Sequence, residues 1–246
     1  MLRIRKIVIG IRPVTKMFRV SSLGGEAVDS VLDRRGTKPL SDDYYSQVAT
    51  NMELGAFRLS NEKIGNELKI DRENVVFTKH HYGANTGVVV ETAIAEFATI
   101  WSAIDDVLRI KDVRRIGIIA EHRFKENDPH VSATLMKALT IISPPVYPAK
   151  FMMRYEERRA TAEGLAPDIK KSDFVNVIRD YYDAELDTEH PEKGSANANI
   201  DVQRYYAPPI SGNIIAEVRK LGKIFNKERE LFIQAISNKG VNAGES

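Results

Sequence analysis

Cysteine is absent from this sequence of 246 residues. Its absence excludes disulfides, thiolate nucleophiles, and zinc or iron–sulfur sites held by cysteine. Long apolar runs are absent too, because charged or polar residues interrupt every stretch well short of the roughly 20 residues that a membrane-spanning helix needs. We therefore expect a protein without membrane-spanning helices that works in the cytoplasm.

Phosphate-loop and nucleophile signatures are also missing. The segment SSLGGE at 21–26 lacks the lysine of a P-loop and the GxGxxG of a dinucleotide fold, and no GxSxG occurs. We therefore expect no cofactor. An excess of one charge sign is missing as well, since 36 Lys and Arg against 34 Asp and Glu leave a formal charge of +2. This balance by itself favours neither nucleic acid nor an anionic membrane as a partner.

Apolar residues make up 43% of the chain and recur with the periods of strands and helices. In the first half we expect a strand over 2–11, a polar connection over 21–40, a helix over 41–55, strands over 57–70 and 74–82, a helix over 86–109 and a strand over 113–124. The second helix is the clearest, because one stripe of it carries Val90, Ile94, Phe97, Trp101, Ile104 and Leu108. This order of elements is that of a ferredoxin-like βαββαβ unit.

The second half shows a similar alternation. A short helix after Asp128-Pro129 should end at Ser143-Pro144-Pro145. We place a boundary at this prolyl segment, between an N-terminal half (1–143) and a C-terminal half (144–246) that pack as one unit. Strands are expected over 149–159, 174–182 and 199–206, and a helix from Ser211 to Gly240 with its apolar face formed by Ile214, Val218, Leu221, Phe225, Phe232 and Ile236. The predicted fold class is α+β, with two antiparallel sheet-plus-long-helix halves.

The two halves also share a local pattern. VVFTKHHYGANTG at 75–87 and IDVQRYYAPPISG at 200–212 each combine an alternating strand, two ring-bearing residues, a turn and a following long helix. Two explanations remain open. One is an internal duplication, and the other is the general pattern of any strand that feeds a helix.

Two neighbouring histidines, His80 and His81, close the strand expected over 74–82. Neighbouring side chains of a strand point to opposite faces, so the two imidazoles cannot bind one metal ion. Either histidine could meet Glu121 or His122 across the sheet, and a carboxylate can orient an imidazole for catalysis. Because no HxxxH or HExxH spacing occurs, we expect no metal site. These four residues are the catalytic candidates, but we favour a structural role at the strand end.

Arginine and tyrosine gather in the strands of the second half. Arginines neutralise phosphates and tyrosine rings can stack on bases, as in ferredoxin-like RNA-binding sheets. No RNP signature accompanies them, and both residue types also anchor protein interfaces. The polar connections 160–172 and 184–198 are further places where a partner could bind. The candidate binding residues are Arg154, Arg158, Tyr181, Arg204 and Tyr205.

Five short segments follow one another along the chain: FRLSN at 57–61, DRENVVF at 71–77, RRIGI at 114–118, NIDV at 199–202 and FxxAI at 232–236. In these segments the chain resembles a sporadically distributed family of uncharacterised bacterial proteins of about this length. It lacks the proline-rich N-terminal lead of that family. The resemblance implies a product of mobile or defence-associated loci and supplies no catalytic residue.

These observations support three functional hypotheses. The first is a non-enzymatic binding or assembly protein, one component of a bacterial multi-protein defence or mobile-element system, with a protein partner or self-association through the arginine and tyrosine residues. The second is a module that binds RNA or single-stranded nucleic acid with the same residues. The third is a hydrolase-like enzyme with a His/Glu site. None of them involves a membrane partner.

Overall fold

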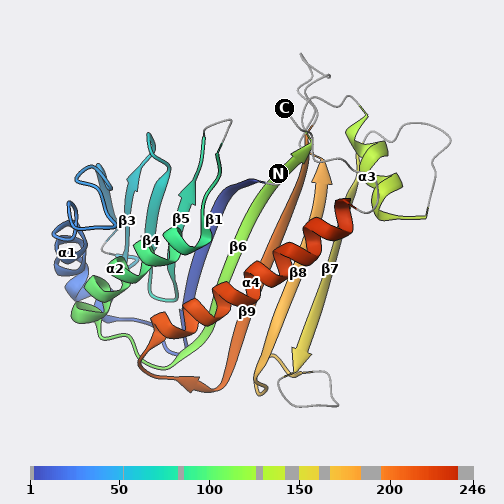
Figure 1. Ribbon diagram of the computed structural model, residues 1–246. Coiled ribbons are helices and arrows are strands. Elements are labelled where there is room, and N and C mark those ends of the chain that lie inside the picture. The colour runs from blue at the N-terminus through green and yellow to red at the C-terminus, as the bar shows by residue number, and fades with distance from the viewer. Residues whose placement is uncertain are drawn as a thin grey trace.

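The computed structural model describes residues 3–51, 53–82, 86–125, 130–141, 150–160, 167–183 and 195–237. In this part of the chain, nine strands form one antiparallel sheet and four helices accompany it (Figure 1). The strands are β1 (Arg3–Pro13), β2 (Gln47–Asn51), β3 (Ala56–Asn61), β4 (Asn66–Ile70), β5 (Val75–His80), β6 (Val113–Lys125), β7 (Met152–Ala160), β8 (Phe174–Asp183) and β9 (Ala196–Ile210). The helices are α1 (Arg19–Leu32), α2 (Val90–Leu108), α3 (Val131–Leu139) and α4 (Ile214–Ser237).

The two halves of the chain share this sheet. Its strand order is β2-β3-β4-β5-β1-β6-β9-β8-β7, so β1 and β6 meet near the middle. Moving outward, β5 lies beside β1 and β9 lies beside β6. The predicted α+β class is therefore confirmed as a mixed structure with one large antiparallel sheet.

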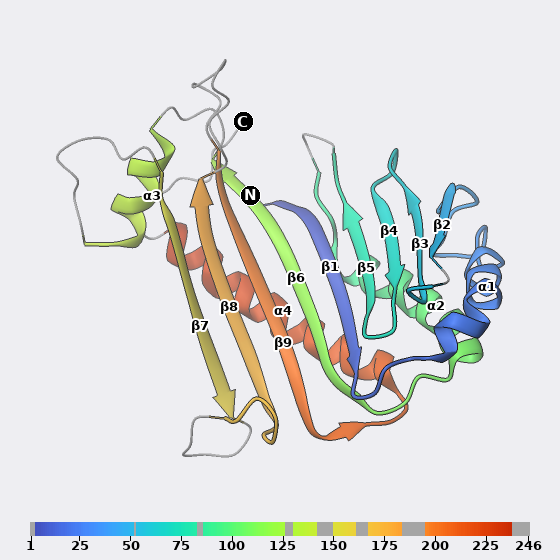
Figure 2. The same ribbon diagram turned by 180° about the vertical axis from the view of Figure 1, so that it is seen from behind.

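The helices pack on one face of the sheet. Figure 1 shows α2 and α4 in front of the strands, and Figure 2 shows the opposite face with no described helix over it. None of the described helices is long and apolar enough to cross a membrane. We call the two faces the helix side and the open face. Open-face positions of the central strands and their neighbours are Lys6, Val8, Gly10 and Arg12 on β1, Arg115, Gly117, Ile119 and Glu121 on β6, Asn197, Asn199, Asp201, Gln203 and Tyr205 on β9, and Phe174, Asn176, Ile178, Asp180 and Tyr182 on β8.

The long helices bury the stripes that their sequences predict. All six stripe residues of α2 are buried, as are the five described stripe residues of α4, and the side chain of Ile236 lies outside the described part. Fully burying such a side chain stabilises the fold by roughly 1.5–3 kcal/mol. α4 is also held by charge, because Glu228, only 1% exposed, is ion-paired with Arg159 and Arg179 of β7 and β8.

Two predictions in the first half are wrong. The segment expected as a polar connection forms α1, and the helix expected over 41–55 is a turn followed by β2. α1 contains Gly24 and Gly25, which disfavour a helix in isolation. Tertiary packing overrides this, because α1 buries an apolar face in the core, formed by Val20, Ala27, Val28 and Val31. Tyr44 and Tyr45 do not form a helix face but enter the core from the turn, each 2% exposed or less.

The first half also departs from the expected βαββαβ order. The strand expected over 57–70 is interrupted by a turn at 62–65 and forms β3 and β4. The order is therefore β1-α1-β2-β3-β4-β5-α2 before β6. The prolyl boundary at Ser143-Pro144-Pro145 lies outside the described residues, as do Asp128-Pro129 and Gly240.

A buried carboxylate joins α2 to the sheet. Glu96 is 4% exposed, and its oxygens accept hydrogen bonds from Lys79 Nζ of β5 at 2.5 and 2.7 Å and from the Tyr44 hydroxyl at 2.8 Å. Burial and the neighbouring carboxylate raise the pKa of Tyr44, so this hydroxyl remains a donor. Glu96 and Tyr44 depend on these contacts, because each would otherwise be a buried polar group without a partner, and the partly buried Lys79 neutralises the carboxylate.

We expect Glu96→Ala to lower the free energy of unfolding by about 3–5 kcal/mol, since it removes one member of a buried ion pair. Urea unfolding followed by circular dichroism measures this. Asp106→Ala is the matched control on α2. The Asp106 carboxylate is exposed to solvent, and so is the guanidinium of Arg34, with which it forms an ion pair at 3.6 Å. Its effect should stay within about 0.5 kcal/mol; equal losses in the two variants would contradict the role of Glu96.

Candidate functional site

The structure does not bring the five predicted binding residues together. Arg154, Arg158 and Tyr205 lie on the open face, whereas Tyr181 and Arg204 lie on the helix side. Tyr181 is 4% exposed, and its ring centroid is 5.3 Å from that of Phe232 on α4. Arg204 is ion-paired with Asp173 at 2.8 Å.

The two candidate binding arginines of β7 are already neutralised. Arg154 pairs with Asp180 at 3.2 Å and Arg158 pairs with Glu156 at 2.8 Å. Exposed pairs of this kind are individually weak, but they reduce the charge available for a partner.

The four catalytic candidates are also distributed over both faces. His80 and Glu121 share the open face but lie on either side of Lys6, to which both are cross-strand partners. Burial, chiefly, and the Lys6 charge lower the pKa of His80. His81 Nε2 lies 2.6 Å from Thr86 Oγ1, so this imidazole contacts a hydroxyl just before α2.

His122 lies in the core, on the opposite face from its neighbour Glu121. It is fully buried under α4, where Arg229 Nε donates to its Nε2 at 3.1 Å. Burial, followed by the Arg229 charge, lowers its pKa to about 3, so the imidazole is neutral at physiological pH. Among the described residues, no group of three His, Asp or Glu side chains could hold a metal ion.

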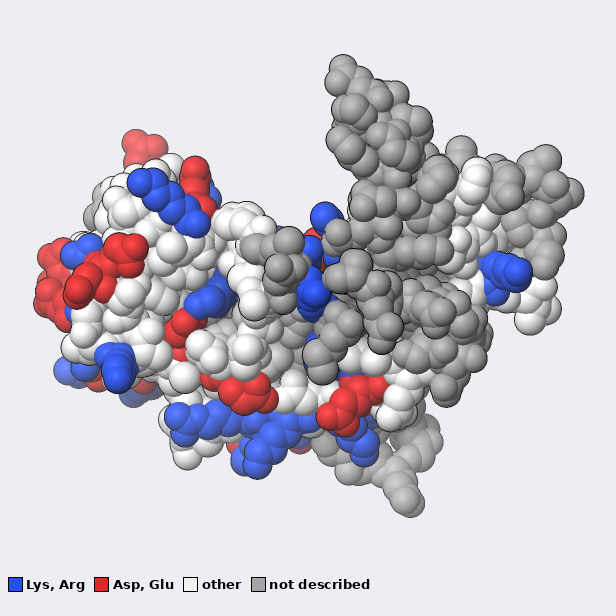
Figure 3. All heavy atoms as spheres, turned by 45° about the horizontal axis from the view of Figure 1, so that its top comes forward, with Lys and Arg blue, Asp and Glu red and all other residues white. Residues whose placement is uncertain are grey.

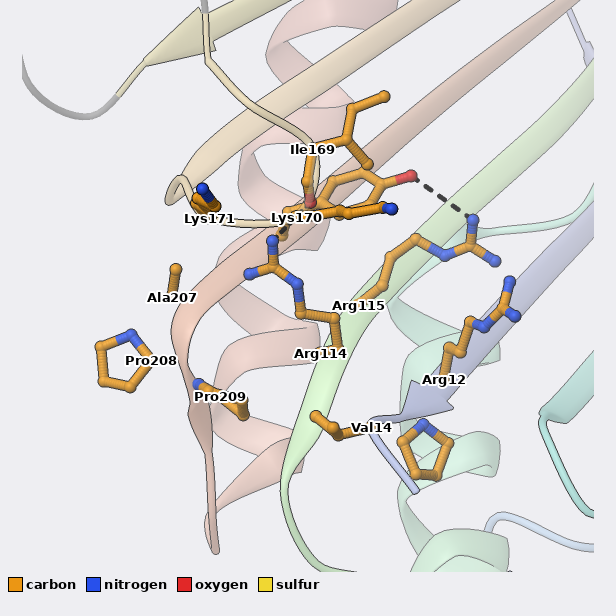
Figure 4. A pocket seen from close by; sticks show the side chains of 12 residues that line it. Arg12, Val14, Arg114, Arg115, Ile169, Lys170, Lys171, Ala207, Pro208 and Pro209 are labelled. Carbon is orange, nitrogen blue, oxygen red and sulfur yellow. Dashed lines mark hydrogen bonds between the residues drawn. The ribbon is translucent and has the colours of Figure 1, made fainter. Parts of the chain in front are cut away.

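A cationic cavity opens at one end of the open face. It has a volume of about 770 Å³ and lies where β1, β6 and β9 meet the segment before β8. Its lining contains five cationic side chains and no carboxylate. Figure 4 shows three arginines from β1 and β6 close to the lysine-bearing segment. We call this cavity the basic pocket; its lining is Arg12, Pro13, Val14, Arg114, Arg115, Ile169, Lys170, Lys171, Tyr205, Ala207, Pro208 and Pro209.

The sheet register builds the basic pocket. Arg12 and Arg115 are cross-strand partners on β1 and β6, and Tyr205 is the partner of Arg115 on β9. Arg114 is held in place, because its guanidinium donates to the backbone carbonyl oxygens of Tyr206 and Ile169. Those bonds fix the lysine-bearing segment against β6.

Part of the charge in the basic pocket is free for a ligand. Arg12 makes an exposed ion pair with Glu73 at 3.5 Å. Arg115, Lys170 and Lys171 have no ion pair with any carboxylate of the described chain. Like charges held this close favour an anionic partner that screens them.

An aromatic pair forms one wall of the basic pocket. The Tyr205 ring stacks on the buried Phe174 ring, with centroids 4.5 Å apart and an interplanar angle of 5°. The guanidinium carbons of Arg114 and Arg115 each lie 5.9 Å from the Tyr205 centroid. The ring is therefore held rigidly on the open face beside cationic groups.

A chain of hydrogen bonds leads away from the basic pocket along β9. Arg115 Nη1 donates to the Tyr205 hydroxyl at 3.5 Å, which donates to Gln203 Oε1 at 2.9 Å. Gln203 Nε2 donates to Asp201 Oδ2 at 2.5 Å. Asp201 Oδ1 is buried without a partner among the described residues, and burial raises the pKa of this carboxyl to about 6.

The sequence contained partial signals for this site. Arg12 and the pair Arg114-Arg115 stand at strand ends, and Lys170-Lys171 belong to the 160–172 connection in which we expect a partner to bind. Nothing in the spacing of these three segments showed that they converge. Residues 161–166 and 184–194, in the two polar connections, lie outside the described residues.

Comparisons with known proteins add little. No protein-family model and no curated protein matches the sequence. Among solved structures, the chain is similar to one described as Methanococcus jannaschii TBP, with 11% sequence identity, coverage of 93% of this chain and 98% of that chain, and a TM-score of 0.27. A similarity this low does not establish a shared fold, so function has to be inferred from the side chains of the site.

Asp201→Asn should raise the free energy of unfolding at about pH 8 by roughly 1–3 kcal/mol, because it removes a carboxylate that burial disfavours. The folded pKa, about 6, lies above the usual value of 3.8, so the folded state binds the proton more tightly. Protonation of Asp201 then stabilises the unsubstituted protein as the pH falls from about 6 toward 3.8. The difference between the proteins, measured by urea unfolding, should therefore shrink between about pH 6 and pH 4. A difference in unfolding free energy that stays constant from about pH 8 to about pH 4 would contradict the raised pKa of Asp201.

Proposed function

We propose that the chain is a non-enzymatic binding protein whose open face holds single-stranded nucleic acid, anchored by phosphate in the basic pocket. The observation that carries this proposal is the set of five cationic side chains around one cavity with no carboxylate in its lining. A phosphate group would neutralise charge that the described protein leaves unpaired at Arg115, Lys170 and Lys171.

The neighbouring surface suits the rest of a nucleotide strand. Tyr205 presents a fixed ring beside the cations, and proteins that bind single strands combine a basic groove with aromatic stacking. The open face also carries half-buried amide side chains, among them Asn199 and Gln203. A single strand fits such a face better than a duplex, because its bases are exposed to the sheet.

The helix side offers a weaker electrostatic site. Figure 3 shows basic and acidic side chains interspersed over the described surface on that side. α4 presents exposed lysines at 223 and 227, but Lys220 is ion-paired with Glu217 at 2.5 Å on the same helix. Alternating charge along a helix is typical of a solvated face.

Binding of a fluorescent single-stranded oligonucleotide should weaken steeply as salt rises. The double variant Lys170→Gln, Lys171→Gln should bind about tenfold or more weakly. Its plot of log affinity against log salt should be shallower by roughly 0.7 for each phosphate that the variant no longer neutralises. Fluorescence anisotropy measures both quantities.

Lys223→Gln, Lys227→Gln is the charge-matched control, since it removes the same charge from the helix side. It should bind nearly as well as the unsubstituted protein. Equal weakening in both double variants would show that only net charge matters, and absence of binding at low salt would refute the proposal.

We also propose that the two halves arose by internal duplication. Each half begins with a central strand, β1 or β6, and ends with the strand beside it feeding a long helix, β5 to α2 or β9 to α4. The repeated pattern at 75–87 and 200–212 spans these equivalent junctions. This supports a division between α2 and β6, earlier than the prolyl segment. A relative with one such unit that dimerises through its β1 would support the duplication, and relatives whose halves differ in strand order would oppose it.

Assembly with a protein partner is the second candidate, and the sheet edges favour it. All five residues of β2 are exposed, and β7 exposes Met152 and Tyr155 at 73% and 43%. Edge strands offer unpaired backbone groups to another strand. Membership of a multi-protein defence or mobile-element system stays a prediction from the family resemblance.

If the β7 edge mediates assembly, native mass spectrometry at micromolar concentration should show a mass above that of one chain. Met152→Lys, Tyr155→Lys should then return the protein to a monomer, because edge lysines block strand addition. A monomer before substitution, with no retained partner, would remove this candidate.

A further inference from the structure

The basic pocket gathers more positive charge than one phosphate inside a nucleotide strand can neutralise. Five cationic side chains line it, and only Arg12 among them forms an ion pair with a described carboxylate, that of Glu73. A phosphodiester inside a strand carries a single negative charge. A terminal phosphate carries about 1.5 to 2 negative charges at pH 7 and offers three acceptor oxygens. The charge of the basic pocket is therefore matched better by a terminal phosphate.

The unpaired cations reach the basic pocket from two walls. Arg115 lies on β6, and Figure 4 shows the Lys170 side chain extending toward it from the segment before β8. One N–H of Arg115 donates to the Tyr205 hydroxyl at 3.5 Å, which leaves most of its donors for a ligand. A guanidinium and an ammonium on two sides can bind different oxygens of one phosphate group.

The lysine-bearing segment is held in place without a ligand. The Asp168 carboxylate accepts from the backbone N–H of Lys170 at 2.7 Å, and the Asp168 carbonyl oxygen accepts from the backbone N–H of Ser172 at 2.8 Å. Arg114 joins this turn to β6 through the Ile169 carbonyl oxygen. Because the cations are already positioned, binding a phosphate group costs less ordering of the protein.

The positive charge ends at the basic pocket and does not follow the open face. From the row of Arg12 and Arg115, the next two open-face rows of β1, β6, β9 and β8 contain no cation but include the carboxylate of Asp201. The next cation on β1 is Lys6, about 20 Å along the strand and opposite Glu121. Proteins that hold the interior of a single strand follow its backbone with a basic groove. Here one phosphate group meets the cations and its neighbours do not.

The wall at the ends of β1 and β9 is apolar. Pro13 and Val14 follow Arg12 along the chain, and a second apolar run follows Tyr205 near the end of β9. These side chains offer no charge to a second phosphate on that side. The basic pocket therefore suits a phosphate from which the nucleotide chain continues in one direction only. The apolar part of this wall is Pro13, Val14, Ala207, Pro208 and Pro209.

We infer that the basic pocket recognises the terminal phosphate of the bound strand and not a phosphate of its interior. The phosphate group lies between Arg115 and Lys170, and the rest of the strand runs from it over the open face. This inference rests on the proposed function and adds to it which phosphate of the strand is bound.

Oligo-deoxythymidines of one length that differ only in a phosphate at one end or the other test this inference. With a fluorophore on an internal base, at about pH 8, one phosphorylated oligomer should bind about tenfold or more tightly than the oligomer with two hydroxyl ends. The charge control is a hydroxyl-ended oligomer two nucleotides longer, which carries about the same charge as the phosphorylated one. Its affinity should rise by less than about twofold, because the added charge lies outside the basic pocket. Anisotropy titrations measure all these affinities.

Arg115→Gln should remove the preference, so that phosphorylated and hydroxyl-ended oligomers bind within about twofold of each other. Arg219→Gln is the matched control, because it removes an exposed arginine from α4 on the helix side. It should keep the preference. Urea unfolding checks that both variants are folded. If Arg115→Gln is not, Lys170→Gln replaces it, since that side chain is exposed and its loss leaves the sheet intact.

The outcomes separate this inference from the proposed function. If no oligomer binds the unsubstituted protein, the proposed function fails and the inference with it. If phosphorylated and hydroxyl-ended oligomers bind equally tightly, or the longer oligomer gains as much as the phosphorylated one, the terminal phosphate is overturned while nucleic-acid binding stands. Loss of the preference in Arg219→Gln as well would also overturn it. Thymidine monophosphate that competes as tightly as the phosphorylated oligomer would show that the basic pocket takes a free nucleotide, and would overturn the assignment to a strand end.

Discussion

The pairing of β1 with β6 is the constraint on which the rest of this structure depends. It joins the opening strands of the two halves from Arg3 with Arg123 to Pro13 with Val113, and so converts two sets of strands into one sheet. Because strand side chains alternate, the pairing also decides which residues face α2 and α4 and which face away. It sets Arg12 beside Arg115, and the cationic end of the proposed binding surface follows from it.

One-sided coverage of the sheet links the fold to the proposed function. The helix side holds the apolar core, with Ile7, Ile9 and Ile118 fully buried there. The open face combines the buried apolar side chains of Phe174 and Ile178 with cross-strand polar contacts such as the hydrogen-bond chain from Arg115 to Asp201. A face that is ordered without a helix over it is available to a partner without unfolding. Nucleic acid suits this face because the unpaired charge is positive and concentrated at one end.

The basic pocket illustrates how such a surface is specialised. Like charges held close together lower the stability of a folded protein, and the grouping of cations there is easier to explain by an anionic ligand than by folding. The histidines that first attract notice in the sequence have structural settings instead, with His122 in the core and His81 bonded to Thr86.

Local periodicity was sufficient for the long elements, because a helix that covers a core must repeat apolar residues at its own period. The apolar stripes of α2 and α4, and most strands, followed from the sequence alone. Periodicity failed at α1, where burial of an apolar face outweighs the two glycines, and at 41–55, where Tyr44 enters the core and bonds to Glu96 of α2. Tyr181 and Arg204 were likewise expected at a binding surface, and only the register assigns them to the helix side.

The sequence by itself thus determined the class of the fold, the positions of its long helices and the absence of cysteine chemistry. Only the tertiary structure decided that the halves share one sheet and that Arg12, Arg115 and Lys170 converge. The physical reason is that strand order and register are set by contacts between residues far apart in the chain, and local patterns carry no record of which strand lies beside which.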